Sequence, residues 1–239
     1  VYVVDEQLRP VPLGAPGARA RNYFYQPPRF SNTDQGDIRI DQTLSTKNNL
    51  YGRFSISRNA QPAVGSFPGF IGGGTSSQDN ATQAVLSDIH IFSPSLVNEF
   101  RFGWYNDKQF DYPNPDLAIP GIGMLGLTVQ SQTNLGTAQD YPRVNPLENR
   151  YQLADTLTWT RDKHTVKFGF DFMNTNDLTN LLFNRTGTYT YPSFSAFAAD
   201  FSDNATGQKR WSTFTQTIGN PRVQFAIRDY AGFVQDQYK

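Results

Sequence analysis

The sequence predicts an all-β fold built from antiparallel hairpins. Three observations lead to this prediction: apolar residues alternate with polar ones, short polar turns separate neighbouring alternating runs, and long Gly- and Pro-rich segments separate the pairs of runs. The 239 residues include 19 phenylalanines, 12 tyrosines and 3 tryptophans, and only 18% are charged. Disordered chains are poor in aromatic residues and rich in charge, so the mean hydropathy of −0.54 reflects alternation within strands.

The first hairpin is expected over 37–57. On either side of its turn the apolar residues occupy alternate positions, namely Ile38, Ile40, Leu44, Leu50, Phe54 and Ile56. The connecting segment 45–48 is short and polar, and it contains serine and asparagine, which favour turns. The two strands are therefore expected to pair as antiparallel neighbours.

Two further hairpins are expected over 82–106 and 149–174. Their strands carry apolar residues on alternate positions, in chain order Val85, Ile89, Ile91, Phe100, Phe102, Trp104, Leu153, Leu157, Trp159, Val166, Phe168, Phe170 and Phe172. A seventh strand is expected over 224–238. Its facing stays open, because Asp229 shares its parity with Ile227.

The connections between the hairpins differ from the turns within them. The segments expected to be long loops are 1–36, 58–81, 107–148 and 175–223. Loops of this length are uncommon in compact soluble domains, whereas membrane β-barrels combine short periplasmic turns with long extracellular loops. A strand of about ten residues tilted near 45° spans roughly 24 Å, close to the ~25 Å apolar band of such barrels. The sequence therefore predicts part of a large transmembrane β-barrel over 1–239, with a soluble β-sandwich as the alternative.

The two faces of the predicted strands favour the barrel. One face is uniformly apolar, so Phe168, Phe170 and Phe172 are expected to face lipid. The other face is expected to line a lumen filled with water. Its charged residues are Asp37, Asp41, Glu99 and Asp171, beside Arg39, Arg53, Arg101 and Lys167. Charges of both signs placed in this way are expected to pair with each other or with a plug domain, and a catalytic acid–base pair is not expected.

The composition argues against several other kinds of site. Lys+Arg and Asp+Glu number 21 each, so the net charge is zero and nucleic-acid binding is disfavoured. There is no cysteine and there are two histidines far apart in the sequence, so neither thiol chemistry nor a metal site is expected. His164 is expected to be a polar strand residue near a turn, and His90 a lumen-facing one. No enzyme activity, no cofactor and no transmembrane helix are expected.

Five runs within the strands resemble barrel segments of TonB-dependent outer-membrane receptors. They are NTDQGDIRID (32–41), LYGRFS (50–55), HIFSPSLVNEFR (90–101), HTVKFG (164–169) and FVQD (233–236). The most similar subgroup is the Oar-like one, whose members often carry a carboxypeptidase-regulatory-like domain at the N-terminus. The resemblance covers most of residues 20–239, and the five runs follow one another in the family's order.

This resemblance implies a barrel of about 22 strands closed by an N-terminal plug, in the outer membrane of a Gram-negative-type bacterium. It also implies import of a scarce large solute, such as a siderophore or an oligosaccharide, with energy delivered by the TonB complex. Neither a plug nor a TonB box is recognisable, so the chain is expected to be an internal piece of the barrel. Its expected partners are outer-membrane lipid, the plug and TonB complex of the full-length protein, and a small or medium solute. A non-transport surface protein such as an adhesin, or a passive porin, is the alternative.

Aromatic residues are the best candidates for solute contact. Tyr105, Phe110, Tyr112 and Tyr141 fall at the outer end of a strand or in the long loop after it. Aromatic rings near Asn and Asp suit stacking on sugars or planar chelates. The alternative is an interfacial girdle with packing inside the loop. Phenylalanines at helical spacing predict a short helix over 193–201.

Overall fold

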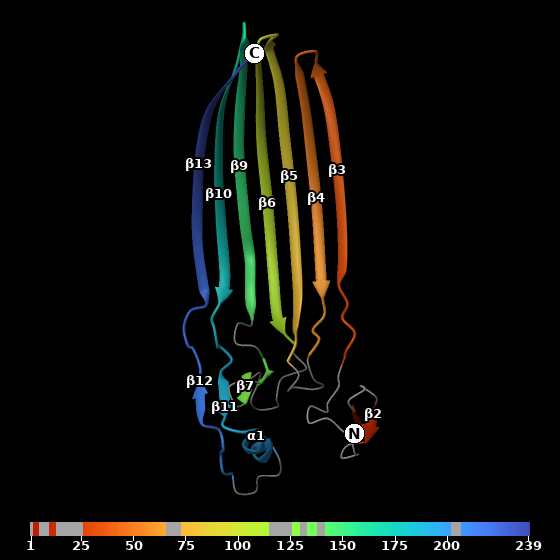
Figure 1. The fold of residues 1–239 in the computed structure, drawn as a ribbon, viewed down its shortest axis with the longest axis vertical. Coiled ribbons are helices and arrows are strands. Elements are labelled where there is room, and N and C mark those ends of the chain that lie inside the picture. Colours follow the sequence, from red (N-terminus) through yellow and green to blue (C-terminus); the bar gives the residue numbers. More distant parts are fainter. Residues whose placement is uncertain are drawn as a thin grey trace.

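The computed structural model describes residues 2–4, 10–12, 26–65, 73–114, 126–129, 133–137, 142–201 and 207–239. Its main feature is a seven-stranded antiparallel sheet in the order β13-β10-β9-β6-β5-β4-β3 (Figure 1). The strands are β3 (Asn32–Ser45), β4 (Asn48–Gln61), β5 (Thr75–Ser93), β6 (Leu96–Pro113), β9 (Arg143–Arg161), β10 (His164–Leu181) and β13 (Arg222–Tyr238). The predicted all-β class and the three predicted hairpins are confirmed.

Tight turns connect the strands at one end of the sheet, and long connections lie at the other end (Figure 1). The turns occupy 46–47, 94–95 and 162–163. In the first, the Ser45 hydroxyl accepts a hydrogen bond from the Lys47 amide at 3.1 Å. In the third, Asp162 has a φ of 54°, which aspartate tolerates better than most residues. Short polar residues therefore hold the turns closed.

The strands run further than the apolar alternation predicts, and the expected loops 58–81, 107–148 and 175–223 are correspondingly shorter. The strands contain 14 to 19 residues, so the connections are 62–74, 114–142 and 182–221. The expected loop 1–36 likewise contains the start of β3 and a small pair, β1 (Tyr2–Val4) with β2 (Pro10–Pro12). The reason is that ladder hydrogen bonds join backbone groups, and they continue where the outward side chains have become polar.

Cross-strand register assigns every strand residue to one of two faces, because directly opposed residues point to the same side. One row contains Phe172, Leu153, Phe102, Leu86 and Ile40. The next row contains Asp171, Ala154, Arg101, Ser87, Tyr51 and Asp41. We call the side of the first row the apolar face and the side of the second row the polar face. The predicted separation of the phenylalanines of β10 from Lys167 and Asp171 follows from this register.

The register corrects the prediction for β5. Val85, Ile89 and Ile91 oppose Gly103, Glu99 and Val97, so they lie on the polar face. The apolar face of β5 instead carries Leu86. Apolar residues occupy both parities of this strand, and only pairing with its neighbours decides which parity faces which side.

The register also determines which face His90 and the residues of β13 occupy. His90 opposes Asn98 and Asn48 and lies on the apolar face, so its expected lumen-facing position is wrong. In β13, Ile227 and Asp229 oppose Thr175 and Met173 on the polar face. The open question of the facing of this strand is thereby resolved.

A smaller sheet forms among the long connections, at the end of the main sheet opposite the tight turns (Figure 1). Its order is β12-β11-β7-β8, with β7 (Gly126–Val129), β8 (Thr133–Gly136), β11 (Thr188–Tyr191) and β12 (Thr213–Thr215). β11 and β7 pair in parallel, which the prediction of hairpins alone did not anticipate. Leu135, Tyr191 and Phe197 form a buried core beneath it. We call this sheet and its helix the loop cluster.

The predicted short helix is confirmed as α1 (Phe194–Phe201). Ser193 caps its start, because its hydroxyl accepts a hydrogen bond from the Ala196 amide at 3.1 Å. Phe197 on its inner side meets Tyr191 edge to face, with ring centroids 5.4 Å apart. Among the described residues, no helix is both long and apolar enough to cross a membrane.

Glycine is required where the connection 62–74 meets the loop cluster. Gly73 has a φ of 65°, and a Cβ there would come 2.5 Å from the Gly136 carbonyl oxygen. Gly73→Ala is expected to destabilise this contact by at least ~1–2 kcal/mol, because the left-handed backbone alone costs that much. Limited proteolysis of the connection measures the effect. Gly219→Ala is the control, since nothing lies within 4 Å of that position, and equal cleavage of the two variants would contradict the assignment.

Candidate functional site

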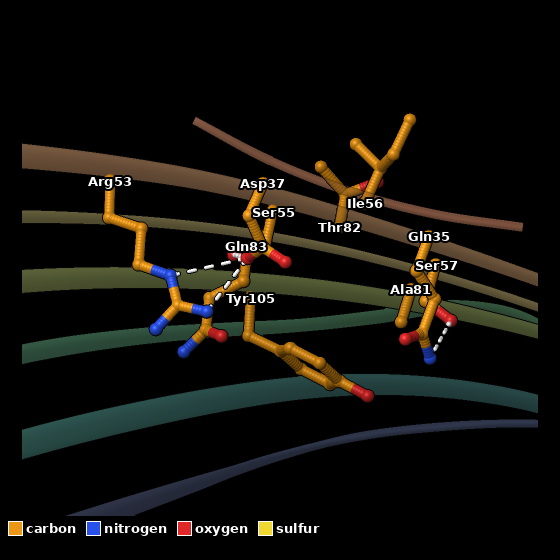
Figure 2. A pocket seen from close by; sticks show the side chains of 10 residues that line it. All are labelled: Gln35, Asp37, Arg53, Ser55, Ile56, Ser57, Ala81, Thr82, Gln83 and Tyr105. Atoms are coloured by element: carbon orange, nitrogen blue, oxygen red, sulfur yellow. Dashed lines mark hydrogen bonds and ion pairs between the residues drawn. The ribbon is translucent and has the colours of Figure 1, made fainter. Parts of the chain in front are cut away.

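The polar face carries two adjoining hollows. The first has a volume of about 220 Å³ and is lined by Gln35, Asp37, Arg53, Ser55, Ile56, Ser57, Ala81, Thr82, Gln83 and Tyr105. Figure 2 shows Arg53, Gln83 and Tyr105 projecting from one side of the strands, while Ile56 and Thr82 point to the other side. The side chains of alternate residues of β3 to β6 therefore form most of the hollow, and Ile56 and Thr82 border it although their side chains point away.

An arginine and an aspartate form an ion pair in the first hollow. The Arg53 guanidinium donates to Asp37 Oδ1 through Nε at 3.2 Å and through Nη2 at 2.7 Å, and the Ser55 hydroxyl donates to the same oxygen at 2.5 Å (Figure 2). Both charged side chains are about half exposed. Such pairs contribute ~0–1 kcal/mol to stability. Their main effect here is to neutralise charge locally.

The same arrangement repeats along the polar face. Arg39 donates twice to Asp41, at 2.7 and 2.8 Å, and its guanidinium lies 4.5 Å above the Tyr51 ring centroid. Arg101 pairs with Glu99 at 3.3 Å. The predicted pairing of lumen charges is confirmed for these residues and for Asp37.

A second hollow of about 270 Å³ lies beside the first, and Gln83 lines both. Its other lining residues include Tyr51, Arg101, Gln152 and Asp171. Asp171 accepts a hydrogen bond from the Gln152 amide at 2.7 Å and makes no ion pair with Lys167. The two hollows give a continuous surface of paired charges, amides and tyrosine rings, which is suited to hydrogen bonding and stacking with a polar solute or with another protein surface.

The structure separates the predicted aromatic site residues. Tyr105 lies on the polar face in the first hollow, where the Arg150 guanidinium is 5.6 Å from its ring centroid. Phe110 and Tyr112 oppose residues of β5 on the apolar face and stack on each other, with centroids 6.5 Å apart and planes at 9°. Tyr141 lies outside the described residues. Tyr105 alone therefore shares a hollow with the paired charges.

Sequence reasoning did not single out several uncharged residues of the polar face as site residues. Tyr51, Gln83 and Gln152 line the hollows although they carry no charge. Their signal was available, since each shares its parity with a charged residue on the same strand. The aromatic residues of the loop cluster were also missed. Tyr189 lies 5.4 Å from Trp211 and 4.5 Å from Phe214 between ring centroids.

An ion pair closes the loop cluster at the end of α1. Asp200 accepts hydrogen bonds from the Arg210 amide at 2.8 Å and from its guanidinium at 3.1 Å. Burial alone would raise the pKa of Asp200, but hydrogen bonds from Arg210 and from the Tyr191 hydroxyl outweigh it and lower the pKa below 3.8. Burial, followed by the charge of Asp200, raises the pKa of Tyr191 to about 12.

These shifts predict how stability of the loop cluster depends on pH. The lowered pKa of Asp200 stabilises the cluster above the ordinary carboxyl pKa, and this contribution is lost as the pH falls through the lowered value. The raised pKa of Tyr191 stabilises the cluster below pH 10, and this contribution is lost as the pH rises towards 12. Fluorescence of Trp211 checks this when Trp104 and Trp159 are replaced by phenylalanine.

Tyr191→Phe is the matched control for that titration. It keeps the ring in the core and removes the hydroxyl, so the alkaline transition should disappear while the acid one remains. An alkaline transition that is unchanged in Tyr191→Phe would contradict the assignment.

The described part of the chain contains no group of three or more His, Cys, Asp or Glu residues arranged to hold a metal ion. No curated protein matches the chain. A solved structure, the outer membrane transporter YddB from Escherichia coli, is similar with a TM-score of 0.57 and 11% identity. The likeness covers 87% of this chain and 25% of that chain, and at this identity it concerns the fold alone. The sequence model of a family described as "Outer membrane beta barrel domain" matches residues 4–239, and the chain belongs to this family and lies in the outer membrane.

Proposed function

We propose that the chain is a wall segment of a TonB-dependent importer of the Oar-like class, which takes up a scarce large solute such as a siderophore or an oligosaccharide. The observation that carries the proposal is a seven-stranded sheet with paired charges on one face and exposed apolar residues on the other. Within the described residues, β3 and β13 each pair along one edge only. The chain spans a quarter of the similar transporter's length, so further strands would complete a wide barrel.

The polar face suits contact with a plug domain. Its arginines are held by neighbouring carboxylates but remain about half exposed, so each can exchange partners at little cost. In the proposed importer the plug is a domain of the full-length protein, and the TonB complex is the partner of that full-length protein. The polar face then forms the wall along which a plug and a solute move.

The loop cluster suits first capture of the solute. It lies at the end of the sheet opposite the tight turns and combines a buried core with exposed aromatic rings such as Phe214. Binding residues concentrate on loops held by a rigid scaffold. We assign the chain a role in binding and transport rather than catalysis, because the paired carboxylates of the polar face are engaged by arginines.

The test is uptake by cells that express the complete parent protein, with labelled siderophores and oligosaccharides offered in turn. Shortening the chain between Asn114 and Pro142 should abolish capture while the barrel still assembles, because β6 and β9 end outside the excised segment. Uptake should also cease in cells without TonB. Unchanged uptake in the shortened protein would show that the loops are not the capture site.

The same experiment distinguishes two other functions from the proposed one. Uptake that persists without TonB would assign the parent protein to the passive porins. A non-transport adhesin is favoured by one observation, the separate buried core of the loop cluster, which resembles a small surface domain. Cell attachment without uptake of any solute would support that function.

A further inference from the structure

Towards the long connections, the apolar face carries a row that combines two cations and an amide. Arg58 of β4 opposes Asn80 of β5, and Asn80 opposes Lys108 of β6. The three side chains therefore leave the same side of the sheet at one level. Neighbouring strands lie about 4.8 Å apart, so the Cα atoms of Arg58 and Lys108 are roughly 10 Å apart with Asn80 between them.

This row lies beyond the run of apolar residues formed by Phe100, Phe102 and Trp104 of β6. On β6 the main run of apolar residues on this face ends with Trp104, and Phe110 and Tyr112 follow only beyond Lys108. The strand rises roughly 27 Å from Leu96 to Trp104, or about 20 Å along the membrane normal at a tilt near 40°. Tyr151 opposes Trp104, so two aromatic residues mark this level. Aromatic residues of this kind mark the boundary between hydrocarbon and headgroups. Lys108 follows on the same strand, on the side of the long connections.

Neither cation makes an ion pair with another residue that the structure describes. Among the described residues, the arginines that pair with carboxylates on the polar face include Arg39, Arg53 and Arg101, whereas Arg58 and Lys108 make no ion pair. Asp34 opposes Arg58 across the strand pair, yet no ion pair joins them. Both cations are exposed. Their charge is available to a partner outside the sheet.

We propose that Arg58, Asn80 and Lys108 bind the phosphate group of an anionic lipid in the membrane leaflet on the side of the long connections. Arginine and lysine are the usual phosphate ligands, and their long side chains can reach from the edge of the apolar band to headgroup level. An amide between them can donate to a third phosphate oxygen. The proposal rests on the outer-membrane location and on the register, and it does not depend on import.

The experiment compares melting of the complete parent protein in vesicles of pure phosphatidylcholine and in vesicles of phosphatidylcholine with phosphatidylglycerol. The anionic lipid should raise the unfolding temperature of the unaltered protein. That shift should be lost in the double variant Arg58→Gln/Lys108→Gln and reduced in Lys108→Gln alone. The single variant keeps the proposal testable if the double variant does not fold.

Lys167→Gln is the matched control, because it makes the same chemical change on the polar face of the same sheet. It should keep the full shift. A shift that survives in Arg58→Gln/Lys108→Gln overturns the proposal, and so does an equal loss in Lys167→Gln, which would indicate an effect of net charge. A shift absent from the unaltered protein would also overturn it and would point to a protein partner at this row instead.

Discussion

Replacing Phe170 by arginine is expected to lower the free energy of unfolding of the membrane-embedded parent protein by about 2–4 kcal/mol. Phe170 lies on the apolar face with 51% of its surface exposed, so we expect it to contact lipid chains in the outer membrane. An arginine there must bring its charge into hydrocarbon or distort the bilayer to reach water. Unfolding of the parent protein from lipid vesicles in denaturant measures the change.

Asp171→Arg is the control for this substitution, since it lies one residue further on the same strand. Its side chain is on the polar face, where the substitution removes the hydrogen bond from Gln152 and leaves the new charge in water. We expect a penalty of about 1 kcal/mol or less, the usual worth of a hydrogen bond between half-exposed groups. Equal penalties at the two positions would contradict the assignment of the faces.

The second large effect is expected in the loop cluster. Phe197→Ala should destabilise the cluster by about 3–5 kcal/mol, the usual range for removing a core phenylalanine. The Phe197 side chain is 6% exposed and packs on Tyr191. The main sheet shares no part of this core, so the barrel should stay folded. Cleavage by added protease within 182–221, followed on intact cells, measures the loss.

Phe194→Ala provides the comparison on the same helix. Phe194 is 61% exposed, although its ring centroid lies 5.7 Å from that of Phe197. Its removal should therefore change the cleavage rate much less. If both variants are cleaved alike, Phe197 does not anchor the cluster.

Local features of the sequence predicted most of the main sheet. Period-two alternation and short polar turns specify each hairpin within a few neighbouring residues, so the three turns could be predicted, as could the shared face of Arg53 and Asp37. The ends of the strands could not, because backbone pairing continues past the apolar band. The face of Val85 and of His90 depended on which residues they oppose in the next strand.

The candidate site likewise contains one feature that the local sequence predicts and one that it does not. Tyr105 differs in parity from Phe110 and Tyr112, so the sequence itself indicates that they lie on opposite faces. The parallel pair of β7 with β11 was not, because it joins segments that are far apart in the chain. Such contacts follow from the closure of the whole fold and leave no local pattern.

The pairing of β7 with β11 also limits how the outer end of the protein can move. β7 belongs to the connection 114–142, and β11 and β12 belong to the connection 182–221. The shared sheet joins β7 and β8 to β11 and β12 as one mechanical body, so neither pair of strands can swing aside as an independent flap. In the proposed importer, a large solute would have to enter beside this body or displace it as a whole, and the slow step of entry would be a single concerted opening rather than the fraying of separate loops.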